Sequence, residues 1–208
     1  MKKTKILATL GPASLNKTVL RRMIDSGLNA VRVNLSHGSI EQCEKIIKLV
    51  RSVKDIPIVF DTQGPEIRIN TKQIITVHEG DQIEIGFDDT FDPYFSKDFH
   101  RKAEKGQIVI VNEGTLRLKI KENKKKSLIL KAEGFGKFEN RARVNIPTIE
   151  TDFKVTTKFD EEAIEFAIKN KIDYIALSYT RNANDVKYIR KLLGKSGIGI
   201  IAKIENHH

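Results

Sequence analysis

The stretch Gly199-Ile-Ile-Ala-Lys-Ile-Glu-Asn206 combines a short apolar run with one amine and one carboxylate. In a β-strand, side chains at positions i and i+2 share a face, so Lys203 and Glu205 are expected to point the same way. A cation suited to a phosphate and an anion suited to a metal, held by one strand, are a sensible start for phosphoryl-transfer chemistry. An exposed ion pair at a strand end explains the stretch equally well. The rest of the chain decides between these two interpretations.

The composition is that of an ordinary soluble protein. The 208 residues can hold one full domain or parts of two, and 39% of them are hydrophobic and 31% charged. Apolar runs fall well short of a membrane span, and the first residues lead into a strand rather than a signal peptide. The single cysteine, Cys43, suits a reducing compartment. We therefore expect a cytoplasmic protein with no membrane partner.

The formal net charge of +10 raises the question of an anionic partner. A basic excess is compatible with nucleic-acid binding, but the chain shows no DNA- or RNA-binding motif and only 7% aromatic residues. Its main basic cluster, residues 119–126, is typical of a solvated hairpin turn. Small anionic substrates fit the charge at least as well, so no nucleic-acid partner is expected.

Hydrophobic patterns indicate two kinds of structure. Strands expected at 5–10, 30–34 and 57–61 alternate with helical patterns, and the alternation returns with a helix at 159–169 and strands at 174–178 and 198–204. Between these parts, short alternating segments separated by turn residues predict an all-β region. We therefore predict an α/β domain formed by residues 1–69 and 144–208, with a small all-β domain at 70–143 inserted into it. Within the insert, residues 87–99 either wrap its core or form the edge of a lid.

Polar residues follow four of the expected parallel strands, where ligands of such sheets bind. A cap or a satisfied core polar group would explain any one of them, but four in succession at the same end favour a binding site. The residues are Arg32, Asn34 and Ser36 after the second strand, Asp61 to Arg68 after the third, Ser178 after the fourth, and Lys203 and Glu205 on the fifth.

Six motifs stand out along the chain: Thr4-Lys-Ile-Leu-Ala-Thr-Leu-Gly-Pro-Ala-Ser14, Arg32-Val-Asn-Leu-Ser-His-Gly38, Asp61-Thr-Gln-Gly-Pro-Glu-Ile-Arg68, Val144-Asn-Ile-Pro147, Ala176-Leu-Ser-Tyr-Thr-Arg181 and Ile201-Ala-Lys-Ile-Glu-Asn206. In this order and along the whole chain, they closely resemble pyruvate kinase. The resemblance implies the first five strands of a TIM (β/α)8 barrel, interrupted after the third strand by a small all-β barrel domain that is mobile and closes over the nucleotide. Strands six to eight and the family's C-terminal domain would then be absent from these 208 residues.

The resemblance also implies roles for the substrate-binding residues. Arg32 and Arg68 would hold phosphates with their forked donors. Lys203 would stabilise the charge of the phosphoryl group in flight and of the enolate. Ser178 and Arg143 complete the set that is implied to contact the substrate or the nucleotide.

Two metal sites are implied in the same way. Asn34, Ser36, Asp61 and the Thr62 carbonyl resemble the family's potassium site, and Glu66 resembles the residue that accompanies potassium dependence. Glu205 would be one protein ligand of Mg2+ or Mn2+, with substrate oxygens and water completing the shell.

The implied function is phosphoryl transfer from phosphoenolpyruvate to ADP, which gives pyruvate and ATP in glycolysis, by a complete protein that is a homo-oligomer. The 208-residue chain is expected to be inactive alone. One alternative is a non-catalytic phosphate-binding or regulatory homologue. Another is a phosphoenolpyruvate/pyruvate-type barrel enzyme that cleaves carbon–carbon bonds, although such an enzyme would not need the inserted domain.

Three departures from the family pattern bear on this function. Gln63 stands where the family motif has a lysine, which removes one positive charge near the phosphates. The family also has a lysine ahead of its GVN segment, for which Arg141 and Arg143 are the candidate substitutes. The carboxylate that would join Glu205 on the divalent metal is absent.

Overall fold

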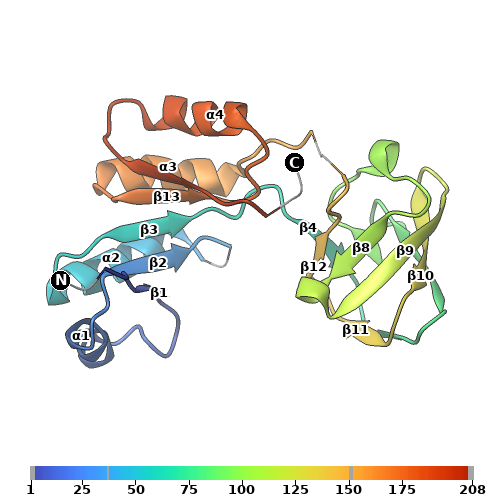
Figure 1. The fold of residues 1–208 in the computed structure, drawn as a ribbon, viewed down its shortest axis with the longest axis horizontal. Coiled ribbons are helices and arrows are strands. Elements are labelled where there is room, and N and C mark those ends of the chain that lie inside the picture. The colour runs from blue at the N-terminus through green and yellow to red at the C-terminus, as the bar shows by residue number, and fades with distance from the viewer. Residues whose placement is uncertain (1–2, 37, 150–151, 206–208) are drawn as a thin grey trace. The chain divides into compact units, whose positions relative to one another are not determined.

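The computed structural model describes residues 3–36, 38–149 and 152–205 (Figure 1). The chain divides into two compact units, which we call the first unit (residues up to Pro65 together with Lys154–Glu205) and the second unit (Glu66–Phe153). The domain limits expected from the sequence, 1–69, 70–143 and 144–208, remain a prediction. The boundaries between the compact units lie at Pro65–Glu66 and Phe153–Lys154 instead, because the two strands that flank the expected insert pair with each other inside the second unit.

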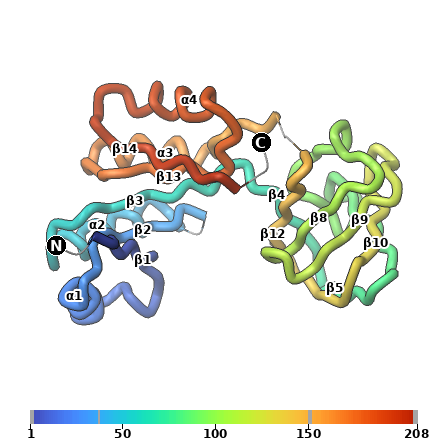
Figure 2. The backbone as a smooth tube through the Cα atoms, viewed as in Figure 1, coloured from blue at the N-terminus to red at the C-terminus, as the bar shows by residue number. Residues whose placement is uncertain are grey.

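The first unit is built on one five-stranded sheet in which every neighbouring pair is parallel, as predicted. Figure 2 shows the strands from the two ends of the chain side by side, where β3 pairs with β13. β1 and β14 occupy the two edges. In sheet order the strands are β1 (Leu7–Thr9), β2 (Ala30–Asn34), β3 (Ile58–Asp61), β13 (Tyr174–Leu177) and β14 (Gly199–Ala202).

In the part of the first unit that the structure describes, four helices accompany this sheet, and each begins at a polar side chain that accepts hydrogen bonds from the first turn. α3 has the strongest start, a capping box in which Thr157 and Asp160 each bind the other's backbone N–H. The helices are α1 (Lys17–Asp25, capped by Asn16), α2 (Ile40–Val53, capped by Ser39), α3 (Lys158–Lys169) and α4 (Ala183–Leu193, capped by Asn182). Among the described helices, none is long and apolar enough to cross a membrane.

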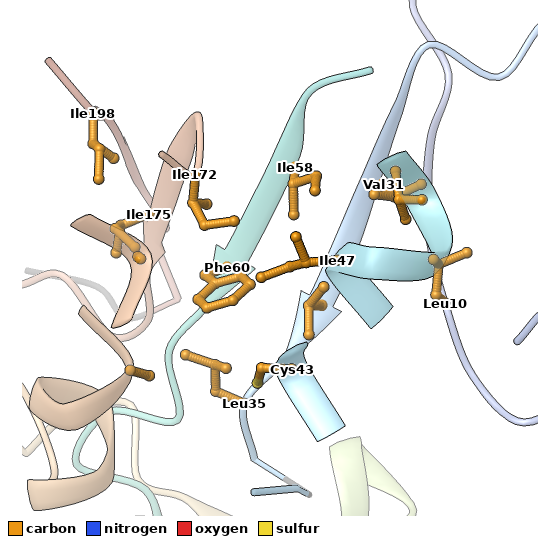
Figure 3. Close-up of a cluster of buried hydrophobic side chains, with 14 of the residues drawn as sticks. Leu10, Val31, Leu35, Cys43, Ile47, Ile58, Phe60, Ile172, Ile175 and Ile198 are labelled. Carbon is orange, nitrogen blue, oxygen red and sulfur yellow. The ribbon is translucent and has the colours of Figure 1, made fainter. Parts of the chain in front are cut away.

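The core of the first unit lies around β3, whose four residues are all buried. Figure 3 shows Phe60 among apolar side chains from its own strand, from α2 and from β13. Phe60 is fully buried, and its ring lies parallel to that of Phe166 from α3, with 6.4 Å between the centroids. Cys43 of α2 belongs to the same core.

The second unit is a closed barrel, which confirms the predicted small β barrel. Its strand order is β10-β6-β7-β4-β12-β8-β9, and a separate two-stranded sheet joins β5 (Ile75–Val77) to β11 (Gly136–Phe138). The barrel strands are β4 (Ile67–Asn70), β6 (Gln82–Gly86), β7 (Tyr94–Phe95), β8 (Ile108–Val111), β9 (Leu116–Asn123), β10 (Ser127–Ala132) and β12 (Ala142–Asn145). Two short 3-10 helices, His100–Lys102 and Asn112–Gly114, complete it.

The prediction for the basic segment 119–126 is wrong in its first half. β9 runs as far as Asn123, with Lys119 and Lys121 on its exposed face, because the alternating Leu118 and Ile120 are fully buried in the barrel. The turn itself is confined to the lysines that follow, where the Lys124 amide donates to the Ser127 carbonyl.

Residues 87–99 wrap the core of the second unit, the first of the two expected alternatives. Phe95 lies in the short strand β7 and is 1% exposed, and Phe99 is 5% exposed. The two rings meet edge to face, with centroids 4.9 Å apart, and Phe87 contacts both. The aromatic residues of this segment therefore serve packing.

Candidate functional site

Asp61 is the centre of a polar cluster at the carboxyl ends of the first unit's strands. It is the last residue of β3, and its side chain is 3% exposed. Nε and Nη2 of Arg32, from β2, both contact its Oδ2. The ammonium of Lys203 donates to Asp61 Oδ1 at 3.0 Å and lies 3.3 Å from Oδ2. Arg32 is also held by Thr9 of β1, whose Oγ1 accepts from Nη1 at 2.7 Å.

Ser178 joins the strand ends of β3 and β13. Its Oγ accepts from Lys203 Nζ at 2.9 Å and lies 2.6 Å from the Thr62 carbonyl and 3.2 Å from Asp61 Oδ1. A hydroxyl has one proton to donate, and the shorter contact assigns it to the Thr62 carbonyl. The backbone N–H of Ser178 donates in turn to Thr62 Oγ1 at 3.0 Å. Three of the predicted site residues are therefore locked to one another around Lys203.

Lys203 and Glu205 lie just beyond β14, which ends at Ala202, so the prediction of one strand through residue 204 is wrong. The two side chains nevertheless meet, with 3.2 Å between Lys203 Nζ and Glu205 Oε1. Glu205 is held in this position by Tyr179, whose backbone N–H donates to Glu205 Oε2 at 2.9 Å. The positive φ of Tyr179, 53°, turns the chain after β13. Asn206, the last residue of this motif, lies outside the described residues.

The residues predicted to hold potassium sit at two neighbouring strand ends. Asn34 ends β2 and is paired in register with Asp61 of β3. The Asn34 side-chain oxygen accepts from the Ser36 backbone N–H at 3.0 Å, and the Asp61 carbonyl accepts from the Leu35 N–H at 2.9 Å. The structure thus brings the oxygens of Asn34, Asp61 and Thr62 together at the carboxyl ends of β2 and β3. The backbone N–H of Ser36 binds the Asn34 side chain and so places Ser36 beside them.

A second cluster lies inside the second unit, around Glu66. Arg68 of β4 and Arg143 of β12 face each other directly in the antiparallel register, an arrangement that is unfavourable for like charges. The carboxylate of Glu66 offsets it, because Oε2 accepts from Arg68 Nε at 2.8 Å and Oε1 lies 3.0 Å from Arg143 Nε. Arg68 Nη1 donates to the Arg141 carbonyl, and Arg143 Nη1 to Glu113.

Nη2 of Arg68 stands out in this cluster. It is buried and lies 2.6 Å from the same Glu66 oxygen that accepts from Nε, so both nitrogens of this side of the guanidinium are paired with one carboxylate. This ion pair holds Arg68 inside the barrel, whereas the side chain of Arg143 on the other side of Glu66 is 40% exposed.

The family model for the barrel domain of pyruvate kinase matches residues 1–208. The chain belongs to the pyruvate kinase family. Pyruvate kinases of three Staphylococcus aureus strains, USA300, NCTC 8325 / PS 47 and bovine RF122 / ET3-1, are each 32% identical to it over 222 aligned residues, which cover 99% of the chain. The chain spans 38% of the length of these relatives.

Two residues that support the candidate site were not predicted from the sequence. Thr9 supports Arg32 through its hydroxyl, and Tyr179 supports Glu205 through its backbone N–H. Thr9 is the last residue of β1, so the rule that ligands bind at the carboxyl ends of parallel strands could have found it. The amide of Tyr179 had no comparable signal, because a non-glycine residue with positive φ is not marked in the sequence.

Proposed function

We propose that the protein containing this chain transfers a phosphoryl group from phosphoenolpyruvate to ADP and so produces pyruvate and ATP. The observation that carries the proposal is the placement of Lys203, whose ammonium is fixed by Asp61 and Ser178 at 3.0 and 2.9 Å and faces Glu205 at 3.2 Å. The side chains of Lys203 and Arg32 remain 27% and 31% exposed, so both can reach a ligand.

In this mechanism the two cations act on the charge of the substrate. Arg32 holds the phosphate with its planar fork, while Asp61 keeps the guanidinium in place. Lys203 stabilises the charge on the transferring phosphoryl group and then on the enolate oxygen that is left behind. Because Asp61 and Ser178 fix the ammonium beforehand, little reorganisation is needed in the transition state.

Glu205 is the residue we propose for Mg2+ or Mn2+. The part of the chain that the structure describes contains no group of three or more acidic, histidine or cysteine side chains that could hold a metal ion. One carboxylate still fits an ion of this kind, since magnesium commonly uses one or two carboxylates together with substrate oxygens and water. The ion would supply positive charge to the substrate oxygens, and Tyr179 would hold the carboxylate in position.

We propose Asn34, Ser36, Asp61 and the Thr62 carbonyl as the potassium site. All four offer hard oxygen atoms, and those of Asn34, Asp61 and Thr62 lie together at the carboxyl ends of β2 and β3. In the second unit, Arg68 and Arg143 are proposed to contact substrate or nucleotide phosphates. The side chain of Arg143 is 40% exposed, so it can reach such a ligand. We further propose that the complete protein is cytoplasmic, acts in glycolysis and is a homo-oligomer.

The second candidate function is phosphate binding without turnover. Gln63 favours it, because the family motif has a lysine there and the charge of that lysine is missing. Titration of the natural protein with phosphoenolpyruvate, alongside an assay of ATP formation, separates the two functions. Binding without any ATP formation would select the second candidate.

The first prediction tests the role of Lys203 in the natural full-length protein. Lys203→Met removes the charge that stabilises the transition state, so kcat should fall by about two to three orders of magnitude. ATP formation from phosphoenolpyruvate and ADP is the measurement. Lys195→Met is the matched control, because Lys195 is exposed and follows α4 outside the cluster. A variant at Lys203 with near-normal kcat would contradict the assignment.

The second prediction concerns the potassium site. Activity measured in tetramethylammonium buffer at constant ionic strength should be low and should rise as potassium replaces the organic cation. The reason is that the oxygens around Asp61 would lack the cation that they are proposed to bind. Full activity without potassium would show that these residues have another role.

A further inference from the structure

Within residues 3–36, 38–149 and 152–205, the chain passes between the two units twice, at Pro65–Glu66 and at Phe153–Lys154. On the side of the first unit, both crossings are attached to the first turn of α3. The residue responsible is Asp160, the third residue of that helix, which is 0% exposed.

The carboxylate of Asp160 accepts hydrogen bonds from both crossings. Oδ1 accepts from the Gln63 N–H at 2.8 Å, and Oδ2 accepts from the Gly64 N–H at 3.0 Å. The same Oδ2 accepts from the N–H of Thr157 at 2.8 Å and from its hydroxyl at 2.9 Å. Gln63 and Gly64 are 97 and 96 residues away in the sequence, so these contacts go well beyond the capping of a helix.

These four donors explain how a charged group can be fully buried at this place. A buried carboxylate is unfavourable unless its lone pairs are satisfied, and Asp160 has about four of them to fill. Capping alone would occupy one oxygen. The other oxygen is satisfied only if residues 63–64 stay where they are.

The second crossing has an additional attachment on the neighbouring residue of α3. Oε1 of Glu161 accepts from Lys154 Nζ at 2.6 Å, from Thr156 Oγ1 at 2.7 Å and from Tyr188 Oη at 2.6 Å. The side chains that follow the second crossing are therefore fixed to the same turn as the backbone that precedes the first crossing.

Gly64 is also held from its other side. Its φ of +67° suits glycine, and a Cβ at this position would lie 3.2 Å from Ser178 Cβ and 3.3 Å from the Tyr179 ring. The backbone between Thr62 and Pro65 is thus fixed between Asp160 and the end of β13.

We propose that Asp160 is a positioning residue that ties both crossings to α3 and thereby holds the backbone of residues 63 and 64, which directly follow Asp61 and Thr62, in place. The consequence for catalysis rests on the function proposed above, whereas the attachment itself does not. The test can therefore be made without substrate.

Amide hydrogen exchange in the 208-residue chain, measured by NMR for the wild type and Asp160→Asn, provides the test. The amide nitrogen of asparagine replaces one of the two oxygens, so either Gln63 or the pair Gly64 and Thr157 must lose its acceptor. We expect those N–H groups to exchange at least tenfold faster, with β13 unchanged. Asp185→Asn is the matched control, since Asp185 is 7% exposed in the first turn of α4 and pairs with Arg181.

Two outcomes would overturn the proposal. Unchanged exchange at residues 63, 64 and 157 in Asp160→Asn would show that the carboxylate does not hold them. An equal acceleration across the whole first unit would show a role in general stability only. Failure of the Lys203 variant to lose activity would bear on the proposed function and would leave these exchange rates unaffected.

Should Asp160→Asn not fold, two other measurements decide. In the wild type, the N–H groups of Gln63 and Gly64 must be protected, and exchange as fast as in an exposed loop would overturn the proposal. Thr157→Ala removes the capping hydroxyl but leaves both bonds to residues 63 and 64. Their protection should persist in this variant even if the first turn of α3 frays, and its loss would reduce Asp160 to a helix cap.

Discussion

Each unit contains one buried carboxylate between two cationic side chains, but the two clusters are assembled differently. Asp61 in the first unit receives Arg32 and Lys203, which come from different parts of a parallel sheet and are 31% and 27% exposed. Glu66 in the second unit lies against Arg68, which is 7% exposed and faces Arg143 across one antiparallel strand pair. The parallel sheet thus leaves both cations of its cluster partly exposed, whereas the antiparallel barrel buries Arg68 and leaves Arg143 40% exposed.

The two units also differ in how their sheets end. The first unit leaves β1 and β14 at the edges of an open sheet, with Leu7 48% and Ile201 39% exposed. The second unit closes into a barrel, which removes the edges. We expect the second unit to keep its structure independently of the first, and the remaining predictions test this difference.

The largest effect is expected from Phe60→Ala. Phe60 is fully buried at the centre of the first unit, so its truncation should lower the free energy of unfolding of that unit by about 3 to 5 kcal/mol. Urea titration followed by NMR signals from both units is the measurement. Leu118→Ala, in the core of the second unit, is the control and should show the opposite pattern. If both units lose stability together in each variant, the two units do not unfold independently.

Next in size is Glu66→Gln, compared with Asp61→Asn. Removing the charge of Glu66 leaves two arginines facing each other, one of them buried, and should destabilise the second unit by about 3 kcal/mol. Asp61→Asn should cost the first unit less, because Arg32 and Lys203 can turn to solvent. The midpoints of urea unfolding of the two units give the comparison. A larger loss in the Asp61 variant would contradict this account of the two clusters.

The smallest effect concerns pH and Glu161. Hydrogen bonds from Lys154, Tyr188 and Thr156 lower the pKa of Glu161 from 4.5 to about 2. A carboxylate with a depressed pKa stabilises the folded state above its unfolded pKa and loses this contribution as the pH falls through the folded value. The first unit should therefore lose about 1 kcal/mol or less between pH 4.5 and 2, since the pair is partly exposed.

Glu161→Gln checks this sign. Urea midpoints of the first unit at several pH values should fall between pH 4.5 and 2 in the wild type and fall less in the variant. The second unit serves as the internal control. A steeper fall in the variant would mean that Glu161 does not have the lowered pKa.

Local sequence patterns were sufficient to predict much of the fold and the residues that the structure brings together around Asp61. The alternation of strands and helices predicted the parallel sheet, and the rule that ligands bind at carboxyl strand ends pointed to Arg32, Asp61, Ser178 and Lys203. These features follow from periodicity and from residue types within one segment. The family motifs then added the expected chemistry.

Contacts between residues that lie far apart in the sequence were determined by the tertiary structure alone. Lys119 and Lys121 were predicted to lie in a turn, but they lie in a strand because the barrel buries Leu118 and Ile120. Glu205 is held by the backbone N–H of Tyr179, which the turn after β13 makes available. In the sequence, Asp160 has the position of an ordinary helix-capping residue. Only the fold brings the N–H groups of Gln63 and Gly64, 97 and 96 residues away, within hydrogen-bonding distance of its carboxylate. Burial and hydrogen-bond satisfaction depend on which segments meet, and a local pattern does not contain that information.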